Sequence, residues 1–342
     1  MITCHTDYPL LSHNTFGLDV RCRQFVEYTE AADLAELVGV CQNEPILHIG
    51  RGSNLLFLEY FDGVVFHSLI TGVEYVGASD ETCLLKVGAG MEWDAFVVWC
   101  VENGCYGLEN LSYIPGEVGA AAVQNIGAYG VEVADFIECV HVFDWQTGHT
   151  VDIPVACCDY AYRHSRFKGT DSGRFVVTHV TFRLNSSFAP KLEYGGLRNI
   201  MSVKGISEVE MTALQLRQLI IEIRRSKLPE VGDLGSAGSF FMNPVVTVEK
   251  ANELLENNPA MPHYAVGDMV KIPAAWLIEQ CGWKGRKIGN VGVYARQPLV
   301  IVNLGGASGE EIAALSRQVQ EDVRNRFGVK ICPEVNFIGN QK

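Results

Sequence analysis

Small residues are most concentrated between positions 114 and 130, in the segment IPGEVGAAAVQNIGAYG. It holds four glycines, three consecutive alanines and one charged residue, so neither a helix nor an ordinary strand is expected there. Small side chains let a ligand approach the backbone, and glycine permits turns that direct several N–H groups toward one point. This composition favours binding of a diphosphate, although a tight crossing of two packed elements would also explain it.

A second loop of small residues, Gly50-Arg51-Gly52-Ser53-Asn54, follows the apolar run 45–49 and precedes the apolar run 55–58. Both small-residue loops therefore leave an apolar segment. Together they predict one nucleotide cofactor held between two units of the chain.

Ser239 stands in the segment GSAGSFFMNP, between a glycine and two phenylalanines. Small neighbours admit a ligand and aromatic rings exclude water, which suits a positioned proton donor. A serine nucleophile would need a histidine base and usually a Gly-x-Ser-x-Gly motif, which this segment does not supply. A serine satisfied by backbone hydrogen bonds in a turn is the alternative interpretation.

Two further residues are candidates for stabilising charge. Glu334 lies in a strand-like segment with Val335 and Phe337 on the opposite parity, and a lone glutamate in a strand often faces solvent. Arg163 lies in a turn rich in arginine, histidine and lysine, where a solvated face is the alternative.

A local basic cluster is formed by Arg224, Arg225 and Lys227. The chain carries a formal charge of −13, so an anionic ligand would need such a cluster to bind. Favourable placement of cations at the end of a helix accounts for the same residues. The negative charge argues against nucleic acid or an anionic membrane as the main partner.

Length and composition indicate a globular chain of more than one domain, with 342 residues, 48% hydrophobic and 20% charged. No apolar run approaches the roughly 18 residues of a membrane span, and the first residues lack the pattern of a secretory signal. The eleven cysteines include no Cys-x-x-Cys, and the nine histidines show no ligand spacing. We therefore expect reduced thiols, no metal and a cytoplasmic location.

Apolar periodicity predicts how these residues are positioned. A strand at 25–28, a helix from Thr29 and a strand at 46–49 form a β-α-β unit. Gly88-Ala89-Gly90 is a strand-to-helix turn and not a Rossmann fingerprint, because position 93 is tryptophan. Further strands are expected at 64–66, 73–76, 84–87, 139–145, 151–153, 175–184, 291–294, 299–303 and 330–338.

Helices are expected at 93–101, 248–257 and 274–281. One more should begin at a capping box of Ser207 and Glu210 and end near Lys227, because proline follows two residues later. Another should begin at the capping box of Ser308 and Glu311 and end at Gly328. A linker is expected at 230–237.

Taken in order, these motifs resemble the MurB family, the UDP-N-acetylenolpyruvoylglucosamine reductases of bacterial peptidoglycan synthesis. The resemblance spans about Asn14 to Ile338, and Tyr194 in LEYGGL matches the subclass that folds a tyrosine loop over the substrate. It rests on NTFG at 14–17, GRGSN at 50–54, IPGEVG with QNIGAYG at 114–130, Tyr162-Arg163, KLP at 227–229, GSFF with NP at 238–244, and PEV at 333–335.

This resemblance implies an α+β, three-domain flavoprotein. A two-domain FAD-binding unit of the vanillyl-alcohol-oxidase-like type would be joined by an α/β substrate-binding domain. The implied domains are 1–68 together with the C-terminal strand 329–342, then 69–228, and then 229–328.

The resemblance also implies the ligands and their contacts. FAD is the cofactor, NADPH is the hydride-donating co-substrate, and the partner is a small-molecule UDP-sugar enolpyruvyl ether. Contacts to FAD are implied for Gly50, Arg51, Gly52, Ser53, Asn54, Leu55, Ile114, Pro115, Gly116, Gly119, Gln124, Asn125, Gly127, Ala128 and Tyr129. Contacts to the substrate are implied for Gln124, Tyr162, Tyr194, Lys227, Asn243, Tyr264 and Lys284.

The implied reaction is NADPH-dependent reduction of UDP-N-acetylglucosamine enolpyruvate to UDP-N-acetylmuramate, a step of cell-wall biogenesis in a monomeric enzyme. Hydride passes from flavin N5 to the vinyl carbon. The implied catalytic residues are Arg163 and Glu334, which stabilise the resulting anion, and Ser239, which donates the proton. Arg51 and the alanines at 120–122 depart from the family pattern and should tune the cofactor site.

Two other functions remain open from the sequence. One is a related FAD oxidase that uses oxygen on a small alcohol, against which the basic cluster and the Ser239/Glu334 pair argue. The other is a non-catalytic protein that binds a UDP-sugar or a nucleotide.

Overall fold

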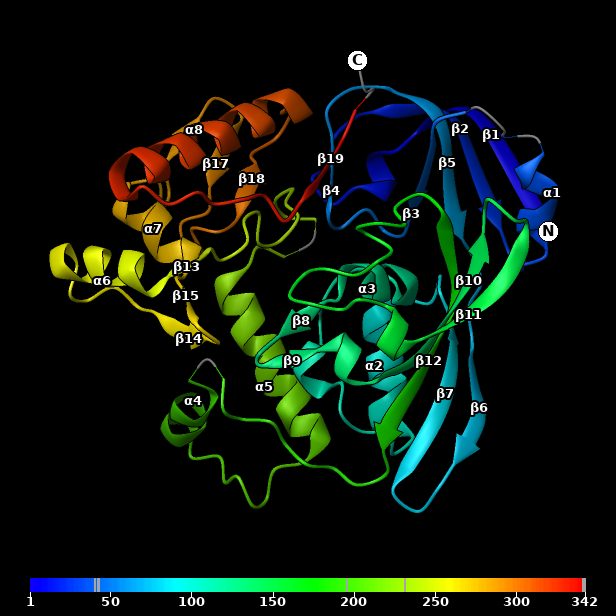
Figure 1. The fold of residues 1–342 in the computed structure, drawn as a ribbon, viewed down its shortest axis with the longest axis horizontal. Helices are drawn as coiled ribbons and strands as arrows, with labels where there is room; N and C mark the ends of the chain where they lie inside the picture. The colour runs from blue at the N-terminus through cyan, green and yellow to red at the C-terminus, as the bar shows by residue number, and fades with distance from the viewer. Residues whose placement is uncertain (40, 42–43, 195, 231, 340–342) are drawn as a thin grey trace. The chain divides into compact units, whose positions relative to one another are not determined.

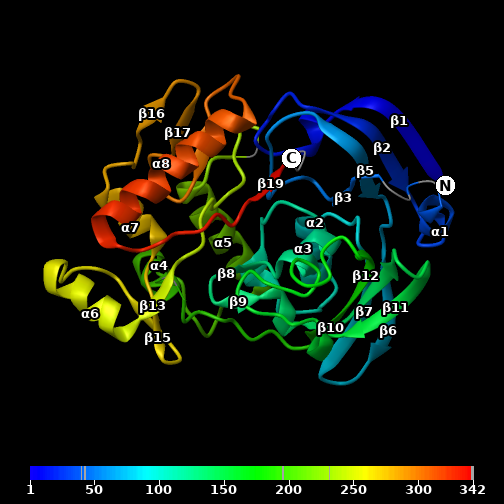
Figure 2. The same ribbon diagram turned by 45° about the horizontal axis from the view of Figure 1, so that its top comes forward.

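The computed structural model describes residues 1–39, 41, 44–194, 196–230 and 232–339. The chain divides into two compact units. The first comprises Met1–Tyr8, Cys22–Arg51 and Asp62–Arg224, and the second Pro9–Arg21, Gly52–Phe61 and Arg225–Lys342. Helices and sheets occur in both, which confirms the α+β class (Figures 1 and 2).

Parts of four expectations lie outside the described residues. Position 40 belongs to the first predicted helix, position 195 to the tyrosine loop, and position 231 to the linker. Positions 340–342 belong to the C-terminal strand region.

The first unit begins with a four-stranded sheet in the order β1-β2-β5-β3, in which β3 and β5 run parallel. The predicted strand, helix and strand at its start are present, but β5 lies between β2 and β3. Buried residues of α1, β2 and β5 form one apolar cluster. The bounds are β1 (Ile2–Pro9), β2 (Arg21–Tyr28), α1 (Asp33–Val38), β3 (Ile46–Ile49) and β5 (Phe61–Ser68).

The larger sheet of the first unit has the order β11-β10-β12-β7-β6 and is antiparallel throughout. Helices α2 and α3 share one buried core with this sheet and lie beside it in Figure 1. The turn at Gly88–Gly90 joins a strand to a helix, as predicted. The bounds are β6 (Val73–Ala78), β7 (Thr82–Gly88), α2 (Trp93–Glu102), β10 (Ile137–Asp144), β11 (His149–Pro154) and β12 (Phe175–Asn185).

The expectation that 114–130 contains no helix is wrong, because α3 covers Val118–Gln124. Its consecutive alanines are strong helix formers, and three of the four glycines lie outside its ends. Gly119 lies within it because the Gly119 amide donates to the Ala89 carbonyl at 2.8 Å. Short elements lie on either side of α3. One precedes it, η2 (Glu109–Leu111), and four come after it: β8 (Gly127–Ala128), β9 (Val131–Glu132), η3 (Val133–Asp135) and η4 (Val155–Cys157).

The last helices of the first unit are α4 (Leu197–Lys204), which the sequence did not predict, and α5 (Ala213–Lys227). The predicted capping box at Ser207 and Glu210 is wrong. Thr212 and Gln215 cap α5 instead: the Gln215 amide donates to Thr212 Oγ1 at 3.2 Å, and the Thr212 amide donates to Gln215 Oε1 at 2.8 Å. The predicted end at Lys227 is confirmed.

The second unit holds three small sheets, in the orders β13-β15-β14, β16-β17-β18 and β19-β4. Helix α8 packs on β17 and β18, and the parallel pairing of β19 with β4 brings the end of the chain beside an early segment (Figures 1 and 2). The bounds are η1 (Leu11–His13), β4 (Leu55–Phe57), β13 (Val245–Thr247), α6 (Val248–Asn257), β14 (Tyr264–Val266), β15 (Met269–Lys271), α7 (Ala274–Gln280), β16 (Lys287–Ile288), β17 (Val291–Val293), β18 (Ile301–Asn303), α8 (Gly309–Phe327) and β19 (Asn336–Ile338).

Two expectations for this unit have opposite outcomes. The capping box of Ser308 and Glu311 and the end of α8 at Gly328 are confirmed. The final strand is shorter than the predicted 330–338, because only Asn336–Ile338 pairs with β4 and Pro333 forms an isolated bridge with Phe241. Proline cannot donate to a strand ladder, which limits regular pairing at that position.

Two kinds of feature are absent from the described residues. No helix among them has the length and apolar character needed to cross a membrane. No group of three or more histidine, cysteine or acidic side chains among them is arranged to hold a metal ion.

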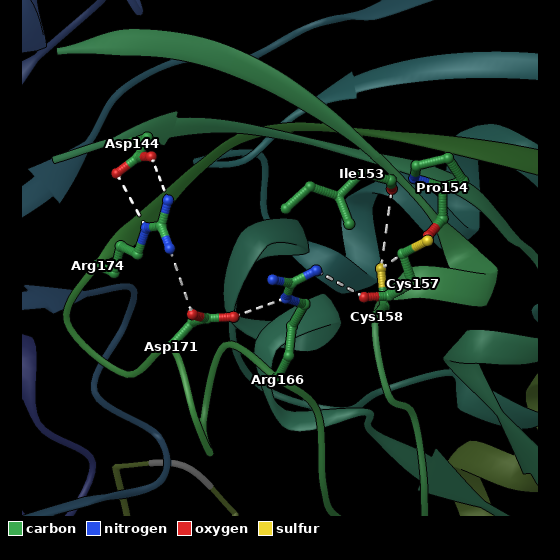
Figure 3. Close-up of polar contacts among 8 residues, drawn as sticks. All are labelled: Asp144, Ile153, Pro154, Cys157, Cys158, Arg166, Asp171 and Arg174. Carbon is green, nitrogen blue, oxygen red and sulfur yellow. Dashed lines mark hydrogen bonds and ion pairs between the residues drawn. The ribbon is translucent and has the colours of Figure 1, made fainter. Parts of the chain in front are cut away.

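The loop from Cys158 to Arg174 is braced by alternating charges (Figure 3). Asp144 accepts two hydrogen bonds from Arg174, at 2.8 and 3.2 Å, and the Arg174 guanidinium holds the pKa of that carboxyl below its usual value. Asp171 then joins Arg174 to Arg166. Arg166 donates to the Cys157 carbonyl at 2.9 Å. This network fixes both ends of the loop that carries Tyr162 and Arg163.

A pair of glycine-to-alanine variants tests the contact between α3 and Ala89. A Cβ at Gly119 would lie 2.8 Å from Ala89 Cβ, whereas a Cβ at Gly39 would meet nothing within 4 Å. We expect Gly119→Ala to lower the free energy of unfolding by about 1–3 kcal/mol, because α3 must move away from the sheet. Gly39→Ala should change it by less than about 1 kcal/mol and in the stabilising direction.

Urea unfolding of both variants, at one fixed flavin concentration, makes the comparison. A Gly119→Ala protein as stable as the wild type would show that the crossing is not tight.

Candidate active site

Arg163 lies at the tip of a tight turn in the first unit. Ala161 and His164 pair through two backbone hydrogen bonds, of 3.1 and 2.9 Å, and Arg163 between them has a φ of +55°. Residues other than glycine seldom adopt this left-handed conformation, and their strain often marks functional sites. The turn directs the arginine side chain back onto the segment that follows α3.

The guanidinium of Arg163 is held by that segment. Its Nη2 donates to the Gly127 carbonyl at 2.6 Å and its Nη1 to the Asn125 carbonyl at 3.3 Å. A Cβ at Gly127 would lie 2.9 Å from Nη1, so only glycine allows this approach. The structure therefore brings Arg163 together with Asn125 and Gly127, which the sequence placed in a different motif.

Asn125 locks the same arrangement from the other side. It ends α3 with a φ of +48°, and its side-chain amide donates to the Ala161 carbonyl at 2.9 Å and to the Glu132 carboxylate at 2.8 Å. Further along the turn, Lys168 donates to Gln124 Oε1 at 2.8 Å. Both ends of the turn are thus docked on the end of α3.

Left-handed backbone recurs in this region. The described residues other than glycine with positive φ include Tyr113, Asn125, Tyr129 and Arg163, all in or beside the segments predicted to bind a ligand. Tyr129 lies on the far side of the 127–128 strand, and its carbonyl accepts a hydrogen bond from Asn110 at 2.9 Å. Such strain is kept only where neighbouring contacts fix it.

Ser239 lies in the second unit, on a segment whose position is set by two buried rings. Phe240 and Phe241 are 1% and 2% exposed, and their ring centroids are 5.0 Å apart. Ser239 itself is half-buried, and its hydroxyl makes no hydrogen bond within the part of the chain that the structure describes. The alternative of a serine satisfied by its own turn is therefore not observed.

The segment after Ser239 pairs with the segment that carries Glu334. The Glu334 amide donates to the Phe240 carbonyl at 2.8 Å, and the Met242 amide to the Cys332 carbonyl at 2.9 Å. Glu334 lies opposite Phe240, the residue after Ser239, and is half-buried, not fully exposed to solvent. The structure thus brings two of the three predicted catalytic residues onto paired segments of the chain.

The Gly50–Asn54 loop, which precedes β4, contacts the segment that carries Glu334. Asn54 donates to the Glu334 carbonyl at 3.3 Å and accepts from the Asn336 amide at 3.0 Å. Gly52 has a φ of +64° and crosses His13 so closely that a Cβ there would lie 1.9 Å from the His13 carbonyl. Gly52, Ser53, Asn54 and Leu55 therefore belong to the second unit, and Gly50 and Arg51 to the first.

The other predicted substrate contacts occupy both units. Tyr162 and Tyr194 of the first unit are 39% and 54% exposed, and Tyr194 packs against Gly130. The remaining four lie in the second unit. Asn243 Oδ1 accepts a hydrogen bond from the Ala274 amide at 2.9 Å, and Lys284 pairs with Glu279 at 2.7 Å. Tyr264 is 58% exposed, and Lys227 lies at the end of α5.

The backbone near Gly50 has groups that suit an anionic ligand. A Cβ at Gly50 would lie 3.0 Å from Glu117 Oε2 and 3.4 Å from Ala120 Cβ, so this loop adjoins the start of α3. Among the described residues, no acceptor is recorded for the amides of Arg51 and Ala120, and both residues are exposed. These donors, with the small side chains beside them, fit a diphosphate of a dinucleotide such as FAD.

The contacts of Glu117 and His67 were not anticipated from the sequence. Glu117 is the one charged residue of the 114–130 segment, a signal that was available but not used. His67 belongs to β5 and pairs with Ile49 next to the Gly50 loop, which no sequence pattern indicates.

Known proteins resemble this chain in sequence and in fold. The family model described as "FAD binding domain" matches residues 22–154, and the model for the C-terminal domain of UDP-N-acetylenolpyruvoylglucosamine reductase matches residues 229–338. A crystal structure of that reductase from Thermus caldophilus has a TM-score of 0.69 at 23% identity over 99% of each chain, which shows a shared fold.

Curated relatives are more similar in sequence. The UDP-N-acetylenolpyruvoylglucosamine reductase of Bacteroides fragilis is 48% identical over 97% of this chain and 99% of its own. That of Porphyromonas gingivalis is 46% identical over 97% of this chain and 98% of its own. Identity at this level along nearly the full length shows that the chain belongs to the UDP-N-acetylenolpyruvoylglucosamine reductase (MurB) family.

Proposed function

We propose that this chain reduces the enolpyruvyl ether of UDP-N-acetylglucosamine to UDP-N-acetylmuramate, with FAD as cofactor and NADPH as reductant. The chain is an FAD-dependent oxidoreductase of peptidoglycan precursor synthesis. The observation that supports the proposal best is the state of Ser239, whose hydroxyl has no hydrogen-bond partner among the described residues and which lies beside the segment that carries Glu334.

FAD, when bound, supplies hydride transfer from NADPH to the vinyl carbon of the substrate. The amides of Arg51 and Ala120 and the rest of the Gly50–Asn54 loop would hold its diphosphate. The remaining proposed contacts to FAD lie along 114–116, 119 and 124–129.

Arg163 stabilises the negative charge that hydride addition sends toward the substrate carboxylate. Its guanidinium is cationic at every accessible pH and binds a carboxylate in a bidentate manner. Because Gly127 and Asn125 already fix its position, little reorganisation is needed as the charge develops.

Ser239 delivers the proton that completes the lactyl ether. An ordinary serine hydroxyl is a weak acid, so it gives up a proton only to a strongly basic carbanion beside it. Glu334, on the paired segment, donates a hydrogen bond to the same anion from its protonated carboxyl group. Tyr162, Tyr194 and Gln124 from the first unit, with Lys227, Asn243, Tyr264 and Lys284, bind the UDP-sugar.

Visible spectroscopy of the purified protein tests the whole function. We expect a bound flavin that NADPH bleaches and that regains its colour, without oxygen, when the enolpyruvyl sugar nucleotide is added. A colourless protein would favour the non-catalytic alternative. Recovery of colour only with oxygen would favour an oxidase.

The proton-donor role of Ser239 predicts a selective loss in Ser239→Ala. Flavin reduction by NADPH should stay near the wild-type rate, because no proton from Ser239 is needed. Reoxidation by the enolpyruvyl substrate should slow by about 10²–10⁴-fold. Stopped-flow traces of the two half-reactions measure both rates.

Ser236→Ala is the matched control, because Ser236 uses its backbone amide, not its hydroxyl, to contact Thr15. It should leave both half-reactions unchanged. Equal losses of both half-reactions in Ser239→Ala would remove Ser239 from the acid role.

Arg163→Lys tests the bidentate role of the guanidinium. Lysine keeps the charge but cannot reach two carbonyls and a carboxylate in one plane, so reoxidation by substrate should slow by about 10²–10³-fold. Arg183→Lys, at an exposed ion pair with Glu138 on β12, should have no effect. A wild-type rate in Arg163→Lys, measured in the same stopped-flow assay, would contradict the proposed role.

A further inference from the structure

Three titratable side chains form a largely buried cluster under the Gly50 loop. His67 Nε2 lies 3.0 Å from Glu117 Oε1, and His67 Nδ1 lies 3.3 Å from Glu27 Oε1. The side chains of Glu117, His67 and Glu27 are 7%, 13% and 25% exposed. They come from the segment before α3, from β5 and from β2, so the cluster joins three elements.

The cluster touches the backbone proposed to hold the diphosphate. Glu117 Oε2 is 3.0 Å from the position of a Cβ at Gly50, so the Glu117 carboxylate lies directly against the glycine. The amides of Arg51 and Ala120, which have no acceptor among the described residues, lie one residue after Gly50 and three residues after Glu117. A buried negative charge beside an anion site is unfavourable unless a cation compensates it.

His67 can supply that cation. Burial acts to lower the pKa of His67, but the hydrogen bonds and charges of Glu117 and then Glu27 outweigh it and leave the pKa raised. An exposed ion pair adjoins the cluster: Arg51, the residue after Gly50, lies 2.8 Å from Glu92, which forms a backbone bridge with Glu117. Two tyrosines are also nearby. Burial raises the pKa of Tyr28 of β2, and burial together with the charge of Glu27 raises that of Tyr8 of β1, so both tyrosines stay neutral near neutral pH.

We propose that His67 is a positioning residue for FAD: as an imidazolium between Glu27 and Glu117, it neutralises Glu117 and fixes it beneath Gly50, so that the adjoining amides donate hydrogen bonds to the diphosphate. This inference rests on the proposed function. It adds a residue that does not touch the substrate and that no step of the reaction uses.

The sign of the pH dependence follows from the charges. Below the folded pKa of His67, one imidazolium faces two carboxylates. As the pH rises through that pKa, the proton leaves and both carboxylates become uncompensated beside the diphosphate. FAD affinity should therefore be highest at low pH and fall as His67 deprotonates, and bound FAD should in turn raise the pKa of His67.

Dissociation of FAD from the holoenzyme, followed by flavin fluorescence between pH 6 and pH 9, tests this inference. For the wild type, we expect the Kd to rise about tenfold across the range, since a neighbouring charge commonly shifts a pKa by about one unit or more. His67→Gln should bind FAD about tenfold more weakly at pH 6, with little change up to pH 9. The double variant with Glu117→Gln should regain affinity within about twofold of the wild type at pH 6.

Three further measurements distinguish this role from a merely structural one. His149→Gln, an exposed histidine on β11, should keep the wild-type pH profile. Glu117→Gln alone keeps the shape of the side chain and should flatten that profile. NMR titration of His67 in the wild type, with and without FAD, should show the higher pKa in the bound form.

The outcomes separate this inference from the function on which it rests. A wild type that binds FAD with a Kd independent of pH, or a double variant no tighter than His67→Gln, overturns the role of His67 and leaves the function intact. A wild type that retains no flavin overturns both.

Discussion

The hydrogen bonds between 125–127 and the turn at 161–164 are the constraint on which the candidate site of the first unit depends. Asn125 and Arg163 both hold left-handed backbone conformations, which cost on the order of 1–3 kcal/mol each for residues other than glycine. Both residues keep this conformation because the side-chain amide of Asn125 donates to the Ala161 carbonyl and the Arg163 guanidinium donates to the Gly127 carbonyl. Each strained residue is therefore held by the other's segment, which leaves the arginine little freedom to move.

A different device orders the second unit. The segments that carry Ser239 and Glu334 lie some ninety residues apart in the chain. Closing so long a loop costs more entropy than forming a short local contact. Burial of Phe240 and Phe241 and the pairing of 240–242 with 332–334 offset that cost. The serine hydroxyl itself is left out of this pairing. The aromatic pair thus fixes the backbone, while the reactive group stays available.

The sequence predicted individual elements better than the contacts between them. Capping at Ser308 and Glu311 was recognised because both partners lie within four residues. The start of α5 was misplaced because Ser207/Glu210 and Thr212/Gln215 both satisfy the pattern, and only packing of Leu216 and Ile220 decides between them. Helix α3 was missed because its glycines outweighed its alanines in the interpretation. The same limit applies to the site, where Arg163, Gly127 and Glu334 stood in recognisable motifs but their partners could not be assigned.

The cluster of Glu27, His67 and Glu117 shows what a motif alone conceals. A glutamate in a segment of small residues would by itself oppose an anionic ligand. In the fold, the histidine that compensates it comes from β5, fifty residues earlier, and a second acid from β2 holds the other face of the ring. Exchange of His67 alone would leave two buried acids without a cation, which costs far more than exchange of all three residues. These residues therefore form one electrostatic unit, and the charge of the motif has meaning only through the sheet beneath it.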